Sequence, residues 1–178
     1  MMAMTTLAQA APQRAQDAAA QHTQYLTFML GGEMFAFGIL AIKEIIEYSG
    51  VTTVPMMPAS IRGVINLRGA VVPVLDLAVR FGRAASATTK RTCIVIVEVD
   101  IDGEQQVLGV LVDAVSAVLD IAGADIEPAP PFGANIPGGF IAGMGKVNGK
   151  FVILLDAARV MSVEDHRLAQ LASQAGAA

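Results

Sequence analysis

The chain has 178 residues, of which 54% are hydrophobic and 16% charged, and its formal net charge is −4. This length suits one domain or two small subdomains around a shared core. The negative charge argues against a nucleic-acid partner, because phosphates call for clustered Lys and Arg. The single cysteine, Cys93, excludes a disulfide within the chain and fits a reducing compartment.

The N-terminal stretch predicts neither a domain nor a membrane anchor. Residues 1–22 are rich in Ala, Gln and Thr, so we expect a disordered tail. The most apolar run, Met34 to Ile42, is about half of the ~20 residues that a membrane-spanning helix needs. The first residues also lack the basic start and apolar block of a signal peptide. We therefore expect a cytoplasmic protein without direct membrane insertion.

From residue 23 onwards the sequence repeats itself. Four segments of the first half recur in order in the second half: "TQYLTFML" as "TCIVIVEV", "GEMFAFGIL" as "GEQQVLGVL", "IRGVIN" as "IAGMGK", and "GAVVPVLDLA" as "GKFVILLDAA". Short apolar strands could resemble one another by chance, but four matches in the same order favour a true repeat. Each copy predicts short strands joined by glycine turns, closed by an aspartate that caps a helix.

The repeat predicts a mainly β fold with two small antiparallel barrels. We expect the first barrel over residues 23–90 and the second over 91–155. Apolar residues at helical spacing predict a C-terminal helix over 156–172. Asp76 and Asp156 occupy the matching helix N-cap positions.

The sequence offers little for catalysis or metal binding. His22 falls in the predicted tail and His166 in the terminal helix, so the two are not expected to converge. Cys93 lies within a predicted strand and is interpreted as an apolar filler. The chain has no zinc-ligand spacing and no phosphate-binding glycine loop. We therefore expect no enzyme activity, no metal and no cofactor.

One apolar segment, "IRGVINLRGAVVPVLDL", contains an arginine and a proline that a buried strand should not carry. Arg68 precedes Gly69, so the pair predicts a tight corner that presents the guanidinium outward. Pro73 predicts that the following strand is an edge or contains a bulge. Glu44, in an amphipathic segment, could pair with Arg68 across a groove. Alternatively, both residues are ordinary solvated charges.

These same segments carry a resemblance to a known family. "FAFGILAIKEIIEYSGVTTVPMMPASIRGVINLRGAVVPVLDL" resembles the CheW coupling proteins of bacterial chemotaxis, and "VLGVLVDAVSAVLDI", "IEPAPPF" and "FIAGMGKVNGKFVILLD" fit the second half of that family. The likeness covers residues 23–161 as one CheW-like domain. "PMMP" at Pro55–Pro58 departs from the usual residues beside the expected groove.

The resemblance implies two Src-homology-3-like five-stranded barrels with short helices. It also implies a non-catalytic adaptor that joins the cytoplasmic hairpin tip of a methyl-accepting chemoreceptor to the regulatory domain of the histidine kinase CheA, recruited to membrane receptor arrays. By analogy, the receptor groove would include Ile42, Glu44, Ile45, Arg68, Val112 and Val115, and Phe132 would pack against a kinase unit. A small-barrel module that binds a soluble ligand remains an alternative at this point, as does an enzyme whose site is not recognised.

Overall fold

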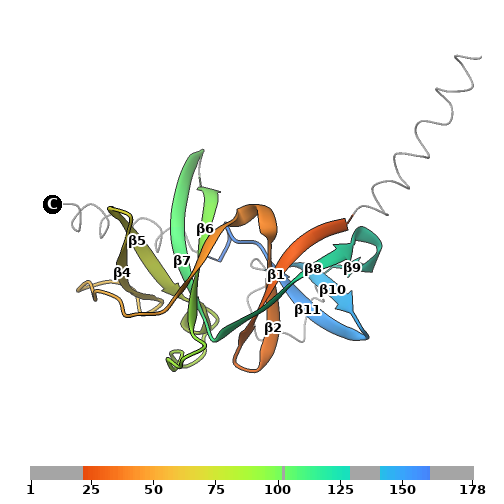
Figure 1. The fold of residues 1–178 in the computed structure, drawn as a ribbon, viewed down its shortest axis with the longest axis horizontal. Helices are drawn as coiled ribbons and strands as arrows, with labels where there is room; N and C mark the ends of the chain where they lie inside the picture. The colour runs from red at the N-terminus through yellow and green to blue at the C-terminus, as the bar shows by residue number, and fades with distance from the viewer. Residues whose placement is uncertain (1–21, 102, 129–140, 161–178) are drawn as a thin grey trace, which may run out of the picture.

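The computed structural model describes residues 22–101, 103–128 and 141–160. Within these ranges the chain forms eleven β-strands in two sheets, with little helix. Figure 1 shows the two sheets beside each other along the long axis of the molecule. The prediction of a mainly β chain is confirmed. No helix in these ranges is long and apolar enough to cross a membrane.

Sheet A has six strands and sheet B has five among the described residues. The order in sheet A is β8 (Ala114–Ala122), β1 (His22–Leu30), β2 (Glu33–Gly38), β11 (Lys150–Leu155), β10 (Ile141–Val147) and β9 (Ile126–Glu127). The order in sheet B is β3 (Ile42–Glu47), β6 (Cys93–Ile101), β7 (Glu104–Val112), β5 (Ala70–Asp76) and β4 (Ile61–Leu67). Neighbouring strands are antiparallel except for the parallel pairs β2–β11 and β5–β7. The short helical pieces are η1 (Ile39–Ala41), α2 (Leu77–Arg80) and η2 (Gly123–Asp125).

The two repeats exchange their first hairpins. The hairpin β1–β2 of the first repeat joins β8 to β11 of the second, and the hairpin β6–β7 of the second repeat joins β3 to β5 of the first. When each strand is matched to its counterpart in the other repeat, sheet A without β9 has the same strand order as sheet B. The sheets therefore do not follow the expected division of the chain at residue 90. A sequence repeat cannot fix which copy a hairpin pairs with, because both copies offer similar strand edges.

Among the residues that the structure describes, the buried hydrophobic side chains form three clusters. The largest lies between the sheets and includes Phe28, whose ring centroid is 6.1 Å from that of Phe35 and 5.1 Å from that of Phe37. A second cluster, which includes Ile121 and Leu154, belongs to sheet A. The third belongs to sheet B and consists of Val74, Ile94, Ile96 and Leu111, with partly buried neighbours. The shared central cluster joins the sheets into one hydrophobic unit.

The predicted caps form, but the predicted C-terminal helix is not seen in the described residues. The carboxylate of Asp76 accepts a hydrogen bond from the backbone N–H of Ala78 at 3.1 Å and caps α2. Asp156 accepts the equivalent bond from Ala158 at 3.0 Å. Residues 157–159 form only a turn, and the rest of the predicted helix lies outside the described ranges. Most of the predicted N-terminal tail also lies outside them, although His22 already belongs to β1.

Candidate functional site

A β-bulge in strand β3 determines which of its side chains share a face. Strand β3 is an edge strand of sheet B, and its pairing with β6 shifts between Ile42 and Glu44. Ile42 pairs with Val97 and Ile45 with Val95, and both partners belong to the central core. Cross-strand partners share a face, so the bulge places Ile42 and Ile45 on the side of the central core. Glu44 lies on the opposite side, toward the cluster of sheet B.

Strand β8 repeats this arrangement at the edge of sheet A. Its pairing with β1 shifts at the matching place, so that Val115 pairs with Phe28 and Val118 with Leu26. Ile45 and Val118 are the exposed members of the two strands, at 42% and 50% of their surface. Ile42 and Val115 are half-buried against the central core. We call these four side chains the β3–β8 groove, after the groove that the family resemblance leads us to expect.

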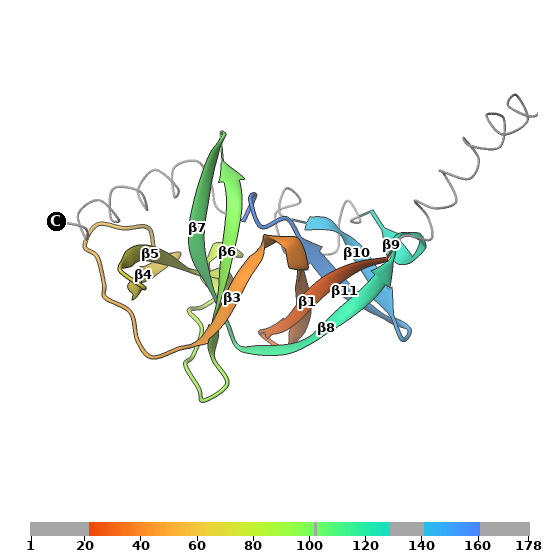
Figure 2. The same ribbon diagram turned by 45° about the horizontal axis from the view of Figure 1, so that its top comes forward.

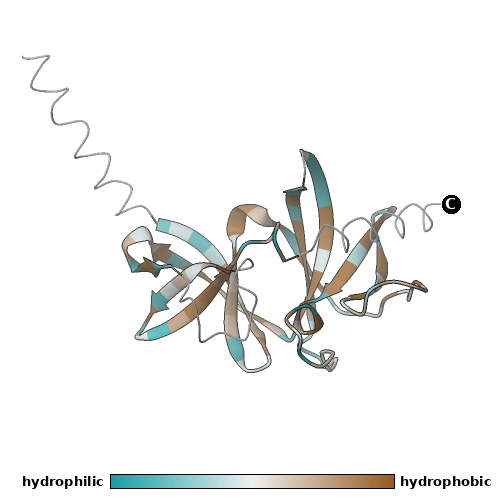
Figure 3. Ribbon diagram, turned by 180° about the vertical axis from the view of Figure 1, so that it is seen from behind, coloured by the Kyte–Doolittle hydropathy of each residue, from teal (hydrophilic) through white to brown (hydrophobic). Residues whose placement is uncertain are grey.

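The two edge strands converge at one end. Figure 2 shows β3 and β8 diverging from a common point, with β1 between them. At that point lies a cavity of about 470 Å³, lined among others by Met29, Glu47, Cys93 and Val115. In Figure 3 the central part of the molecule is mostly brown, which marks apolar residues, whereas teal segments lie toward the ends of several strands. Of the four side chains of the β3–β8 groove, Val115 is the one that lines this cavity, and charged residues such as Glu47 and Arg91 also border it.

The structure changes one member of the expected groove. Val112 is fully buried in β7, where it pairs with Cys93, so it supports the groove from beneath and does not line it. Val118, which sequence reasoning did not name, is exposed on β8 at the place that matches Ile45 of β3. The repeat could have indicated Val118 as the counterpart of Ile45, but only if the pairings β3–β6 and β8–β1 had been known.

Glu44 and Arg68 form an ion pair. The Nη2 atom of Arg68 lies 2.7 Å from the Oε2 atom of Glu44. The Glu44 side chain is 22% exposed and that of Arg68 is 76% exposed. The pair joins edge strand β3 to the β4–β5 turn at the opposite edge of sheet B. The pair therefore spans the gap between the two edges of sheet B, and it does not span the β3–β8 groove. We call this gap the mouth of sheet B.

The β4–β5 turn has the predicted corner geometry. Arg68 has φ 53° and Gly69 has φ 88°, which is typical of a two-residue hairpin turn of type I′. The side-chain oxygen of Asn66 accepts a hydrogen bond from the Gly69 N–H at 2.9 Å. The expectation that Pro73 marks an edge strand is wrong, because this residue is buried and β5 lies between β4 and β7. The pairing of β5 with β4 does contain a register shift, which lies between Ile61 and Gly63 of β4. The pairing of β5 with β7 begins at Val74, so no ladder bond requires an N–H on Pro73.

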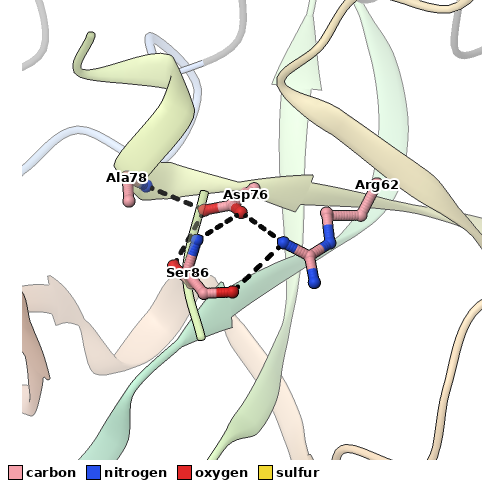
Figure 4. Close-up of polar contacts among 4 residues, drawn as sticks. All are labelled: Arg62, Asp76, Ala78 and Ser86. Carbon is pink, nitrogen blue, oxygen red and sulfur yellow. Dashed lines mark hydrogen bonds and ion pairs between the residues drawn. The ribbon is translucent and has the colours of Figure 1, made fainter. Parts of the chain in front are cut away.

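A buried polar network anchors the other end of this hairpin (Figure 4). Asp76 is fully buried, and its Oδ2 atom accepts hydrogen bonds from Arg62 Nη1 at 2.9 Å and from the Ser86 N–H at 3.0 Å. Its Oδ1 atom accepts bonds from Ala78 N at 3.1 Å and Ser86 Oγ at 3.0 Å. Arg62 Nη1 also donates to the Ser86 carbonyl at 3.2 Å. This network holds the start of β4 and the end of β5 together and so supports the turn that carries Arg68.

The remaining candidate residues show no convergent chemistry where they are described. Cys93 is half-buried, less than expected for a core residue, and its thiol donates to the Arg91 carbonyl at 3.3 Å. His22 is exposed in β1. The described residues contain no group of three His, Cys, Asp or Glu side chains that could hold a metal ion. Phe132 and His166 lie outside the described ranges.

Comparisons with known proteins agree on one family. The model of the CheW-like domain matches residues 24–165. Chemotaxis protein CheW of Klebsiella aerogenes is 34% identical over 145 residues, which cover 82% of this chain and 85% of the relative. The Rhizobium meliloti CheW is 34% identical over 146 residues, covering 82% and 92%. Among solved structures, scaffolding protein TtCheW of Thermoanaerobacter tengcongensis matches with a TM-score of 0.73 at 34% identity, over 82% of this chain and 91% of that one.

Two β-sheets with exchanged hairpins, matched over this length, define a scaffold protein of bacterial chemotaxis, a class without catalytic activity. This chain belongs to the CheW family. Because the family is non-catalytic, this membership rules out the alternative of an enzyme whose site was not recognised. It also confirms the resemblance stated from the sequence and the CheW-like fold.

Proposed function

We propose that this chain links the cytoplasmic tip of a chemoreceptor to the regulatory domain of a CheA-type histidine kinase, on the cytoplasmic side of receptor arrays. The observation that carries the proposal is the β3–β8 groove. It offers two exposed aliphatic side chains, Ile45 and Val118, above two half-buried ones. The hairpin tip of a chemoreceptor is helical, and an amphipathic helix can place its apolar face in a groove of this kind.

Apolar and charged groups would contribute differently to this contact. Side chains at the centre of the groove lose most water on binding, so they would supply most of the affinity. Arg68 is 76% exposed and lies on a turn beside the groove strand β3. Exposed charges of this kind mainly affect the rate and the orientation of association. We place the kinase contact at Phe132, by analogy with the family.

The proposal can be tested by calorimetric titration of the purified chain. The partners are a soluble fragment of the receptor tip and the CheA regulatory domain, both from the same organism. We expect micromolar or tighter binding to each. Ile45→Asp should weaken receptor binding and leave kinase binding unchanged, whereas Phe132→Ser should do the reverse. Absence of binding to both partners by the folded wild-type chain would contradict the proposal.

A soluble-ligand module has less support. A second cavity, of about 540 Å³, lies at sheet A and is lined mainly by apolar atoms, including those of Leu119, Val147 and Phe151. A specific small-molecule site usually adds a few convergent polar groups. Thr27, one of the polar residues at this cavity, already uses its hydroxyl in two hydrogen bonds with the backbone of Ala117.

A further inference from the structure

A side chain of β1 holds the β-bulge of β8 in place. The pairing of these two strands shifts between Thr27 and Phe28, and Ala117 pairs with Thr27 directly beside the shift. The hydroxyl of Thr27 donates a hydrogen bond to the Ala117 carbonyl oxygen at 2.9 Å and accepts one from the Ala117 N–H at 3.1 Å. One hydroxyl therefore engages both backbone groups of the residue that follows the bulge.

The matching bulge of β3 has no such side chain. Thr27 is 1% exposed and is the residue with a hydroxyl in the otherwise hydrophobic core of β1. The repeat matches it to Ile96 of β6, which is also fully buried and pairs with Glu44 beside the bulge of β3. An isoleucine side chain can neither donate nor accept a hydrogen bond. The fold thus builds this bulge without a threonine in sheet B and with one in sheet A.

The start of β8 has a second anchor that β3 lacks. The N–H of Asp113, just before β8, donates to the Met29 carbonyl oxygen at 3.0 Å. The Oδ2 atom of Asp113 accepts a hydrogen bond from the Gly31 N–H at 2.8 Å. At the matching place before β3 stands Leu40, which belongs to η1 and is 98% exposed. Strand β8 is therefore tied to the hairpin β1–β2 on both sides of its bulge.

The bulge of β8 decides where its groove residues point. Val115 and Val118 are three residues apart, so in a regular strand they would lie on opposite faces. The shift lets them pair with Phe28 and Leu26, which both belong to the central core. A slip of one residue in this pairing would turn Val118 to the other face. The two hydrogen bonds to Ala117 oppose that slip, because they hold the neighbour of Val118.

We propose that Thr27 is a positioning residue of the β3–β8 groove. Its hydroxyl fixes the bulge of β8, so that β8 forms an ordered side of the groove, while β3, which lacks this bond, adjusts to the partner. An ordered side loses less conformational entropy on binding and so raises the affinity. The inference rests on the proposed function, because the partner is the receptor tip. The order of β8 itself can be measured in the free chain.

Backbone hydrogen exchange of the full chain, followed by NMR, tests the order of β8. In the wild type, the amide of Ala117 should exchange at least about tenfold more slowly than that of Glu44, its counterpart in β3. Thr27→Val removes the hydroxyl and keeps a branched side chain, so exchange at Ala117 should become about tenfold faster. Thr27→Ser keeps the hydroxyl and should restore the wild-type rate to within about twofold.

Thr92→Val is the matched control. Thr92 is 2% exposed, and its hydroxyl accepts a hydrogen bond from the Thr89 N–H at 2.8 Å, away from the bulge of β8. This variant also removes a bonded hydroxyl from a buried threonine, but it should leave exchange at Ala117 unchanged. In calorimetric titrations with the receptor-tip fragment, Thr27→Val should bind about three- to tenfold more weakly than the wild type. Thr27→Ser and Thr92→Val should bind as the wild type does.

Each readout can overturn the proposal separately. Equal exchange at Ala117 and Glu44 in the wild type would show that β8 is no more ordered than β3. If Thr27→Val speeds exchange at all amides alike, or if Thr27→Ser fails to restore the rate, the hydroxyl does not fix the bulge. Faster exchange with unchanged receptor affinity would show that the groove does not use this order. If the wild-type chain binds no receptor fragment, the proposed function fails, and the exchange rates still decide whether Thr27 fixes the bulge.

Discussion

Asp76 and Asp156 occupy matching positions in the two repeats and cap matching turns, yet their surroundings differ. Asp76 is fully buried and accepts bonds from Arg62 and Ser86 as well as from its own turn. The Asp156 side chain is 39% exposed, and its ion-pair partner is the nearby Arg159, at 3.5 Å. The sequence predicted both caps, because capping is local. It could not predict the network, whose members come together only in the folded hairpin.

This difference predicts unequal effects of one substitution. Asp76→Ala leaves the partly buried Arg62 without its carboxylate and frees the segment around Ser86, so it should lower the free energy of unfolding by about 3–5 kcal/mol. Asp156→Ala removes a partly exposed cap and should cost about 0.5–2 kcal/mol. Urea denaturation of both variants measures the two costs. Equal costs would show that the network adds nothing beyond capping.

The groove residues can be tested with exposure-matched variants. Val118→Asp should weaken binding of the receptor-tip fragment by at least about 2 kcal/mol, because it places a charge among apolar contacts. Phe151→Asp is the control, since Phe151 and Val118 are both 50% exposed and Phe151 lies on a different hairpin. Calorimetric titration compares the two. A similar loss for both would contradict the assignment of the groove.

At the level of elements, the pattern of strand β3 could not be interpreted from sequence alone. In a regular strand, successive side chains point to opposite faces, so Ile42 and Ile45 of "IKEIIE" would lie on opposite faces. The bulge moves them to one face. The expectation that both face one groove came from the family resemblance. The structure shows why both residues share a face: the bulge shifts the pairing of β3 by one residue.

Glycines at the start of two matching strands predict a second contrast. A side chain at Gly63 would collide with the carbonyl oxygen of Thr52, whose backbone forms a bridge with Val64. A side chain at Gly143 would lie 3.0 Å from Ile126 Cγ2 and 3.1 Å from the Glu127 carbonyl oxygen.

Because a carbonyl fixed by a bridge cannot move aside easily, Gly63→Ala should destabilise the fold by about 2–3 kcal/mol. Gly143→Ala should cost less, since the side chain of Ile126 can shift. Thermal or urea unfolding ranks the two variants. The reverse order would indicate that the bridge between Thr52 and Val64 is not rigid.

For the whole molecule, the sequence predicted the repeat but not the exchange. The alignment of the two repeats by their glycine turns is also shifted. It matches Gly38 to Gly109, whereas the strand registers match Ala36 to Gly109. The hairpin β6–β7 extends further before its turn than β1–β2 does. A local alignment follows turns, while the fold follows the pairing of strands that lie far apart in the chain.

The exchange predicts that neither half of the chain folds alone. Fragments 1–90 and 91–178 each lack the hairpin that completes their sheet, and the central phenylalanines of one half require the valines of the other. Circular dichroism should show each fragment largely unfolded and a mixture of both regaining β structure. Independent folding of either fragment would contradict the shared core. The same test applied to a chain cut within β6 should fail to recover structure, because the cut interrupts a central strand.

The exchanged arrangement also carries an evolutionary meaning. Two half-length chains that swapped hairpins about a two-fold axis would have the strand order seen in both sheets. Duplication and fusion of one ancestral gene, through the segment between α2 and β6, would turn such a dimer into a single chain. Once fused, the halves could diverge, and in the present chain sheet B has Glu44 and Arg68 where sheet A has Ala117 and Asn148. A symmetric ancestor cannot present two different faces, and its asymmetric descendant can serve two partners at once.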